Sequence, residues 1–325
     1  MQTGQQNETR APTLAEIQDA RRTISGIALR SPLVPLNTTG VAAEIYLKLE
    51  NLQPIGSFKI RGAANVMKHL PREQLVRGVM TASAGNMAQG VAWNARKLGV
   101  PCTVIVPETA PQTKLDAITR LGSRIIKAPF DKWWEAFETR TYPGVDATFV
   151  HAFDDTNMIA GNGTIGLEIL EDLPDAETIV IPWGGGGLAC GIAAAVRALK
   201  PKCHIFAAEV ETAAPLATSW AEGTPQPVDY HPSFVDGIGV KTVFPHMLTL
   251  AKKLLDGSLV VSLEEVISAI RLLAERNRVI AEGAGACSVA SAITGKAGTG
   301  KIVCVVSGGN IDSSKLCAIL KGENP

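Results

Sequence analysis

Four consecutive glycines at residues 184–187 do more than any other feature to restrict how this chain can fold. They join residues 178–183, a run typical of a buried strand, to the helical pattern of residues 188–199. A strand that leads through a glycine turn into a helix is typical of parallel α/β sheets. Glycine also allows a ligand to approach the backbone closely, and a helix start offers free N–H groups to an anion. We therefore expect a loop for a phosphate monoester. The alternative is a flexible turn, for which one or two glycines would be enough.

The same alternation of strand and helix runs along the whole chain. The expected strands are 45–49, 79–82, 103–106, 124–128, 148–151, 178–182, 205–209, 259–262 and 302–306. The expected helices are 14–24, 59–69, 87–98, 112–121, 157–170, 188–199, 263–277 and 283–293. Thr13 with Glu16, and Ser262 with Glu265, predict capping boxes at two helix starts. This pattern predicts an α/β protein with parallel, doubly wound, open sheets.

Composition narrows the class of protein further. The 325 residues leave room for about two domains, and 46% hydrophobic against 5% aromatic residues predicts an aliphatic core. Lys and Arg total 31, as do Asp and Glu, so no basic surface for nucleic acid is indicated. The six cysteines form no C-x-x-C pair, and the polar residues 1–10 lack an apolar signal core. Since no apolar run is long enough for a membrane, we expect a cytoplasmic protein with reduced thiols.

Residues 56–62, with the sequence G-S-F-K-I-R-G, place Lys59 between an aromatic residue and an isoleucine at an expected helix start. A lysine among apolar neighbours loses stabilisation of its charge, so its pKa falls and its amine becomes a usable nucleophile. Schiff-base chemistry requires such an amine. A lysine at a helix start is ordinarily solvated, so this segment gains its weight from other motifs.

Those motifs are S-A-G-N at 83–86, the tetraglycine loop at 184–187 and S-G-G-N at 307–310. With residues 56–62 they resemble the fold-type II pyridoxal-phosphate (PLP) enzymes, specifically the serine/threonine dehydratase and serine racemase family. The resemblance implies the tryptophan-synthase-β-like fold with two doubly wound open sheets, and a homodimer. It also implies a large PLP-binding domain made of residues 1–78 and 151–325, with a small domain inserted at 79–150.

The resemblance assigns roles around the cofactor. Lys59 would be the Schiff-base lysine that removes the α-proton, and Ser307 would face the pyridine nitrogen. A neutral hydroxyl there does not force that nitrogen to be protonated, which favours elimination over a long-lived carbanion. The other cofactor-binding residues that the resemblance implies are Phe58, Asn86, Gly184, Gly185, Gly186, Gly187, Leu188, Gly237 and Glu282.

Substrate binding is implied for Ser83, Ala84, Gly85, Asn86 and Met87, at an expected strand end where a helix start offers N–H groups to a carboxylate. Ala84 stands where serine racemases have a hydroxyl that protonates Cα, so we do not expect efficient racemisation. Met87 stands where family members usually have histidine. It either accommodates an apolar β-substituent, as in phenylserine, or is a core methionine of the helix.

Three further patterns concern a metal site and two nucleotide-binding motifs. Glu209 matches one carboxylate of the family's divalent-cation site, but Pro215 stands where that site has its second acid, so we expect no metal. Residues 161–166 fit G-x-G-x-x-G without the adjacent strand and acidic residue of a dinucleotide site, and predict close helix packing instead. Residues 295–301 fit G-x-x-x-x-G-K, but Ile302 replaces the required Ser or Thr, which predicts a turn.

We therefore expect a PLP-dependent lyase that converts an L-β-hydroxy-α-amino acid to an α-keto acid and ammonia. Threonine, serine and an aryl-serine such as phenylserine are the candidate substrates. A β-replacement enzyme of the cysteine synthase type and a non-catalytic ligand-binding protein of the same fold are the alternatives. Release of keto acid distinguishes the lyase from the β-replacement enzyme. A reducible bond between Lys59 and the cofactor excludes the non-catalytic ligand-binding protein.

Overall fold

Two β-sheets form the framework of the protein, of which the computed structural model describes residues 9–325. The larger sheet has the strand order β1-β2-β10-β7-β8-β9, and the smaller sheet has the order β5-β4-β3-β6. Within the described residues, each strand pairs in parallel with its neighbours except β1 with β2. The larger sheet contains β1 (Leu33–Pro35), β2 (Glu44–Leu49), β7 (Thr178–Pro182), β8 (His204–Val210), β9 (Gly257–Val261) and β10 (Lys301–Val306). The smaller sheet contains β3 (Val79–Ala82), β4 (Cys102–Pro107), β5 (Arg124–Ala128) and β6 (Thr148–Phe149).

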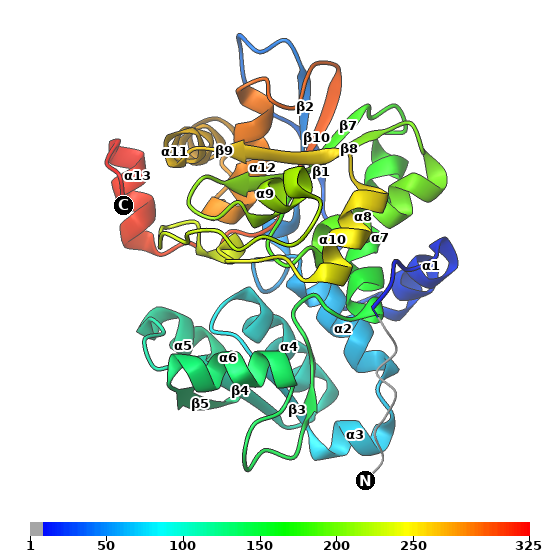
Figure 1. Ribbon diagram of the computed structural model, residues 1–325, viewed down its shortest axis with the longest axis vertical. Coiled ribbons are helices and arrows are strands. Elements are labelled where there is room, and N and C mark those ends of the chain that lie inside the picture. Colours follow the sequence, from blue (N-terminus) through cyan, green and yellow to red (C-terminus); the bar gives the residue numbers. More distant parts are fainter. Residues whose placement is uncertain (1–8) are drawn as a thin grey trace.

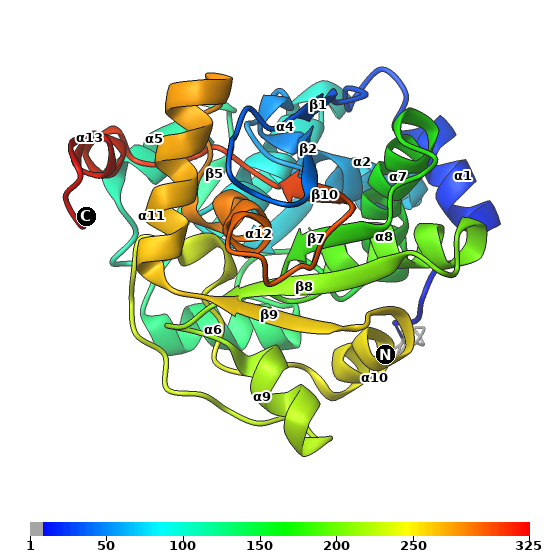
Figure 2. The ribbon, with the colours of Figure 1, turned by 90° about the horizontal axis from the view of Figure 1, so that it is seen from above.

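Helices pack on the faces of the sheets, as the two ribbon views show (Figure 1, Figure 2). They are α1 (Leu14–Thr23), α2 (Lys59–His69), α3 (Arg72–Arg77), α4 (Asn86–Leu98), α5 (Gln112–Arg120), α6 (Phe130–Thr139), α7 (Thr156–Asp172), α8 (Gly187–Leu199), α9 (Pro215–Glu222), α10 (Pro245–Leu254), α11 (Leu263–Leu272), α12 (Gly283–Ile293) and α13 (Ser313–Lys321). Single helical turns lie at η1 (Glu50–Leu52), η2 (Asp236–Ile238) and η3 (Leu273–Asn277). The predicted α/β class with two parallel-rich sheets is confirmed, and both capping boxes are present.

Two elements end at least two residues earlier than the sequence predicts. Strand β6 stops at Phe149 instead of residue 151, because the ring of His151 accepts a main-chain N–H from Asp154 at 2.8 Å and so turns the chain. The helix expected at 263–277 is α-helical only to Leu272, where it widens into the π-turn η3. Arg278, with φ of 58°, then ends it in the left-handed region.

The smaller sheet draws its strands from residues 79–149, within the segment predicted as an inserted domain. The division into 1–78 with 151–325, and 79–150, stays a prediction. Residues 1–8 of the polar N-terminal segment lie outside the described residues. In residues 9–325, none of the helices combines the length and the apolar character that a membrane crossing requires.

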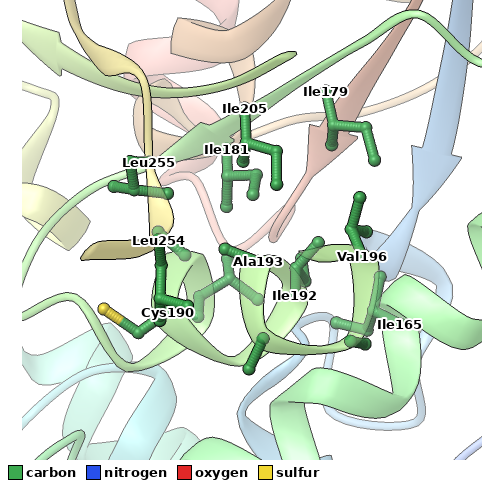
Figure 3. Packing of buried hydrophobic residues seen from close by; sticks show 14 of the residues in the cluster. Ile165, Ile179, Ile181, Cys190, Ile192, Ala193, Val196, Ile205, Leu254 and Leu255 are labelled. Carbon is green, nitrogen blue, oxygen red and sulfur yellow. The ribbon is translucent and has the colours of Figure 1, made fainter. Parts of the chain in front are cut away.

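The largest part of the core lies between the larger sheet and α8 (Figure 3). Ile179 and Ile181 of β7 and Ile205 of β8 face Ile192 and Val196 of α8, and each of these five side chains is inaccessible to solvent. Strands buried on both faces need such continuous apolar runs, which is why this region is readable from the sequence.

Glycines bring α7 close to α8 and α2. A Cβ on Gly163 would lie 2.8 Å from the main-chain oxygen of Gly191, and a Cβ on Gly166 would lie 2.8 Å from that of Ile192. A Cβ on Gly161 would lie 2.8 Å from the main-chain oxygen of Arg61. Residues 161–166 therefore serve helix packing, as predicted.

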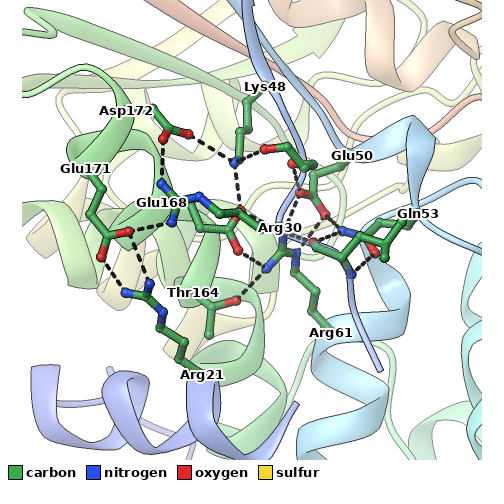
Figure 4. Close-up of polar contacts among 12 residues, drawn as sticks. Arg21, Arg30, Lys48, Glu50, Gln53, Arg61, Thr164, Glu168, Glu171 and Asp172 are labelled. Atoms are coloured by element: carbon green, nitrogen blue, oxygen red, sulfur yellow. Dashed lines mark hydrogen bonds and ion pairs between the residues drawn. The ribbon is translucent and has the colours of Figure 1, made fainter. Parts of the chain in front are cut away.

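A buried network of charges anchors α2 (Figure 4). Arg61, in the first turn of α2, is 1% exposed and forms ion pairs with Glu50 at 2.8 Å and with Glu168 at 2.7 Å. Lys48 pairs with Glu168 at 2.7 Å from another side. Two buried cations thus face two buried carboxylates. Since Lys59 is the first residue of α2, this network fixes the position of the candidate site.

Candidate functional site

Lys59 opens α2, and its amine is withdrawn from water. Nζ donates to the main-chain oxygen of Ala152 at 2.9 Å and lies 5.0 Å from the ring centroid of Phe58. Burial of the amine lowers the pKa of Lys59 from 10.5 to about 8, although the carboxyl group of Glu282 opposes the shift. The residue as a whole keeps partial exposure, so the site stays open on one side. The structure thus has the lysine of lowered pKa that residues 56–62 predict.

The end of strand β10 lies directly beside this lysine. The N–H of Phe58 donates to the main-chain oxygen of Ser307 at 3.0 Å, and Ser57 forms an isolated β-bridge with Gly308. Ser57 is inaccessible to solvent, and its hydroxyl has no hydrogen-bond partner among residues 9–325. A buried hydroxyl without a partner is costly, so this atom suits a site that a polar ligand completes.

The tetraglycine loop has the predicted position between β7 and α8. Packing of Phe153 against the loop is an additional reason why glycine is required there. A Cβ on Gly185 would clash with the ring of Phe153, and one on Gly187 would lie 2.9 Å from the Cβ of Phe153. Gly186 has φ of 91°, which few other residues adopt. The loop therefore needs glycine to admit Phe153 as well as to leave the start of α8 open to an anion.

Asn86 and Glu282 meet across 196 residues of sequence. The side-chain amide of Asn86 donates to Glu282 Oε1 at 2.8 Å, and its oxygen accepts from Asn310 Nδ2 at 2.7 Å. Burial raises the pKa of Glu282 to about 7, and the nearby charge of Asp236 adds to this. Gly308 packs against both partners, since a Cβ there would lie 2.5 Å from Glu282 Oε1. The start of α4, the start of α12 and the end of β10 are thus joined at one point.

Gly237 completes this ring of contacts. A Cβ on Gly237 would lie 3.4 Å from Glu282 Oε1, and a Cβ on Gly184 would lie 3.6 Å from the main-chain oxygen of Gly237. Next to it, Asp236 forms an ion pair with Lys114 of α5 at 2.5 Å. The structure therefore brings the residues predicted to bind the cofactor into one connected set of contacts.

The loop predicted to bind the substrate lies at the carboxyl end of β3. The Ser83 hydroxyl accepts the N–H of Gly85 at 3.1 Å, so it stabilises its own loop. A Cβ on Gly85 would have no neighbouring atom within 4 Å, and Ala84 is partly buried. Met87 is 2% exposed and packs in the apolar cluster between α2, α4 and the smaller sheet. This burial favours the core interpretation of Met87 over contact with a substrate.

Sequence reasoning missed residues 151–154, which support the lysine. Burial lowers the pKa of His151 to about 3, so its ring is neutral and Nδ1 accepts the N–H groups of Asp154 at 2.8 Å and Phe153 at 3.4 Å. This fold of the loop presents the oxygen of Ala152 to Lys59. Phe137 packs on the His151 ring with 4.5 Å between centroids. The aromatic residues of α6 are the sequence signal for this support, but the sequence does not show that they pack against His151.

Asp154 connects this loop to both sides of the molecule. Its carboxylate accepts from Arg140 Nη2 at 2.6 Å, in the connection after α6, and contacts His246 Nε2 of α10 at 2.7 Å. The loop that positions Lys59 is therefore held between the two sheets.

The carboxylate of Glu209 accepts three hydrogen bonds, and the described residues contain no cluster of three or more His, Cys, Asp or Glu side chains that could hold a metal ion. The Glu209 carboxylate accepts the N–H groups of Leu216 and Ala217 at the start of α9, both at 2.8 Å, and the Ser258 hydroxyl at 2.6 Å. Burial raises the pKa of Glu209 to about 7, while these donors oppose the shift. A helix start thus lies where the family's cation site would have its second carboxylate.

The chain is similar to known proteins over a range that includes the whole site. Residues 24–308, which include all the residues predicted to bind cofactor or substrate, match the family model described as pyridoxal-phosphate dependent enzyme. The chain is 42% identical to the L-threonine ammonia-lyase of Thermotoga maritima over 315 residues, which cover 95% of this chain and 78% of that protein. It is 37% identical to the catabolic L-threonine dehydratase of Staphylococcus aureus over 322 residues, covering 95% and 92%. Its structure superposes on that of maize serine racemase with a TM-score of 0.87 at 30% identity, covering 96% and 98%.

Proposed function

Because the chain belongs to the family of pyridoxal-phosphate-dependent enzymes, we propose that it is a threonine dehydratase, a lyase that converts L-threonine to 2-oxobutanoate and ammonia. The observation that carries the proposal is the amine of Lys59, which has a pKa of about 8 and donates to Ala152, while the next residue, Phe153, packs on the glycine loop 184–187 that opens α8. The relatives named for action on threonine are 42% and 37% identical to the chain, which supports the choice of substrate.

The residues of the site fit the cofactor of this family. The loop 184–187 with Leu188 would hold the phosphate at the N-terminus of α8, and Lys59 would hold the carbonyl carbon. Among residues 9–325 the buried hydroxyl of Ser57 has no hydrogen-bond partner, and Gly184 is only partly buried, so a polar group and an open stretch of main chain remain for the cofactor. When bound, pyridoxal phosphate supplies the electron sink for the negative charge that develops at Cα of the substrate.

Lys59 is the proposed base. At a pKa of about 8, part of its amine is neutral near neutral pH and can accept the Cα proton. The hydrogen bond to the oxygen of Ala152 fixes the direction of Nζ, and the His151 ring fixes that loop. Base and support therefore form one preorganised unit, which holds the amine in place before the substrate arrives.

The start of α4 is the proposed site for the substrate carboxylate. It offers main-chain N–H groups near Asn86, and no acidic residue lies in its first turn. The Ser83 hydroxyl already binds the N–H of Gly85, so Ser83 acts by shaping the loop. Asn86 is oriented by hydrogen bonds to Glu282 and Asn310. Rotation of its side-chain amide would break these bonds.

Ser307, at the end of β10, is the proposed partner of the ring nitrogen, with Phe58, Gly237 and Glu282 bordering the ring. Its hydroxyl is neutral and would not force that nitrogen to be protonated, which would favour expulsion of a β-substituent. The β-hydroxyl then leaves with one proton as water. The 2-aminobut-2-enoate that remains takes up a proton at Cβ, becomes an imine and is hydrolysed by water to 2-oxobutanoate and ammonia.

An aryl-serine such as phenylserine is the second candidate substrate. The observation that favours it is the partly exposed ring of Phe153, which follows the lysine's acceptor Ala152 and lies against Gly185. Phe244 packs on Phe153 with 5.3 Å between ring centroids and extends the apolar surface. An aromatic wall favours an aryl group over a methyl group through its larger apolar contact area.

The test is release of keto acid and ammonia by the PLP-loaded enzyme from L-threonine, L-serine, L-threo-3-hydroxyaspartate and L-threo-phenylserine. We expect turnover of threonine with the highest kcat/KM. Preference for phenylserine would replace threonine by the aryl-serine. Formation of cysteine from serine and sulfide, without keto acid, would instead establish the β-replacement alternative. A homodimer in solution is part of the proposal, and light scattering on the loaded enzyme checks it.

A further inference from the structure

A cavity of about 340 Å³ lies between the C-terminal ends of α4 and α5. Its other side is formed at the amino edge of the smaller sheet, by Cys102 in β4 and by Ser123 just before β5. The substrate loop at Ser83 follows the carboxyl end of β3, at the opposite edge of the same sheet. Since the 13 residues of α4 span about 20 Å, the cavity is separate from the lysine site.

The lining of this cavity combines apolar surface with positive charge. Ala95 and Val100 contribute apolar surface, while Arg96 and Arg120 are exposed at its edge. In the described part of the chain, neither arginine forms an ion pair. Arg96 donates to the main-chain oxygen of Arg120 at 3.3 Å, which orients one guanidinium and leaves its other donors free.

A buried hydroxyl supplies an independent sign of a ligand. Ser123 is 8% exposed, and its Oγ has no hydrogen-bond partner in residues 9–325. The thiol of Cys102 is its polar neighbour, since the hydroxyl opposes the rise that burial causes in the pKa of this thiol, but a thiol is only a weak hydrogen-bonding group. Buried polar atoms in native proteins generally have partners, so this hydroxyl is available to a polar group that enters the cavity.

We propose that this cavity binds a small organic carboxylate with an apolar body, and that such a ligand is an effector of the enzyme. The two guanidinium groups recognise the carboxylate, the Ser123 hydroxyl donates to it, and the apolar wall holds the body. A bare inorganic anion lacks the apolar contact, and a neutral molecule lacks the attraction of the arginines.

Helix α4 connects the cavity to catalysis. It begins with Asn86, which is hydrogen-bonded to Glu282 and Asn310 in the lysine site, and its last turn carries Arg96 at the cavity. Gly90, midway along the helix, packs on Lys59, since a Cβ there would lie 3.1 Å from the main-chain oxygen of Lys59. A ligand that shifts the end of α4 therefore changes the position of its start relative to the lysine.

The binding test uses benzoate as the probe, titrated calorimetrically into the PLP-loaded enzyme, with acetate and benzyl alcohol as probes that lack the body or the charge. We expect benzoate to bind at least about tenfold more tightly than either of them. The double variant R96Q/R120Q should lose about tenfold affinity for each charge-assisted bond removed. The exposed Arg72, which lies outside the cavity, gives the matched control R72Q, and this variant should bind as the wild type does.

Equal affinity of benzoate for the wild type and for R96Q/R120Q would place binding outside this cavity and overturn the site. Absence of binding to the wild type would overturn it as well. The effector role has its own readout, which rests on the proposed function. Benzoate should change kcat/KM of the wild type without competing with the amino acid, and should leave R96Q/R120Q unaffected. Binding without any change in the wild-type kinetics overturns the effector role alone. Because calorimetry needs no turnover, failure of the proposed function does not affect the binding result.

Discussion

Lys59 and Arg61 lie two residues apart on the same helix, yet their surroundings shift their pKa values in opposite directions. Burial lowers the pKa of Lys59 to about 8. Burial also lowers the pKa of Arg61, but the charges and hydrogen bonds of Glu50 and Glu168 outweigh it, so the pKa of Arg61 ends above its ordinary value. The difference lies in the partners, because the Lys59 amine meets the neutral oxygen of Ala152 where Arg61 meets two carboxylates.

This comparison separates a group that holds the fold from a group that is kept reactive. A buried cation with matched carboxylates is fixed in its charged form. Removing one partner of such an ion pair strongly destabilises the folded protein. A buried amine without an ion pair is ready to lose its proton, which general-base chemistry requires. Both groups sit on α2, so the paired cation holds in position the unpaired one beside it.

Replacing Lys59 by alanine should have the largest effect, on activity alone. Loss of the base and of the covalent attachment of the cofactor should lower kcat at least about a thousandfold for any substrate that the enzyme accepts. The urea midpoint should stay unchanged or rise, because the variant no longer buries an amine. Coupled assay of 2-oxobutanoate with urea unfolding followed by circular dichroism checks both parts. Substantial remaining turnover would falsify the assignment of Lys59.

Replacing Arg61 by methionine should show the opposite pattern, with the main effect on stability. The change keeps the apolar volume but leaves Glu50 without a cation, which should cost about 3–5 kcal/mol of unfolding free energy. The matched control is Arg21→Met, which removes a cation of the same network that is half exposed and paired with Glu171 (Figure 4). That exposed pair should contribute no more than about 1 kcal/mol. Equal urea midpoints for the two variants would contradict the comparison.

The difference between the two cations marks where sequence reasoning ends. The segment 56–62 predicts a lysine of lowered pKa, and the helix 59–69 is predicted with the bounds that it has. What the sequence does not contain is the loop that turns the oxygen of Ala152 toward Lys59. That loop depends on a neutral His151 packed against Phe137, and the helix α6 that carries Phe137 was not predicted.

Local patterns were readable where the chain itself decides the structure. Strands 79–82 and 178–182 and helix 283–293 have the predicted bounds, since apolar runs and glycine turns mark their ends. The bond between Asn86 and Glu282 joins segments 196 residues apart, and only the resemblance to a family placed both at the cofactor. Met87 shows the limit from the other side, since a methionine at a helix start reads equally as a ligand contact and as the core residue that its burial favours.

The pH dependence of cofactor attachment sharpens the comparison further. Only the neutral amine attacks the cofactor, so below the pKa of Lys59 the rate should rise about tenfold per pH unit. Because the pKa is lowered to about 8, the rise should level off near that pH, whereas an ordinary lysine at 10.5 would continue to gain. Stopped-flow absorbance of pyridoxal phosphate mixed with cofactor-free protein, between pH 6 and 10, measures this. A rate that still climbs above pH 9 would contradict the lowered pKa.

Replacing Glu282 by glutamine should have the smallest effect, a shift of that same profile. The Glu282 carboxyl raises the pKa of Lys59, so its removal should move the levelling point to a pH below about 8. Glutamine keeps an oxygen that can accept from the Asn86 amide, so the geometry of the site should persist. Glu264→Gln, on the exposed face of α11, removes a carboxyl of the same type far from the amine and should leave the profile unchanged. An unchanged levelling point in Glu282→Gln would mean that the carboxyl is not ionised when Lys59 titrates. The pKa of Lys59, on which the contrast with Arg61 rests, would then be set by burial alone.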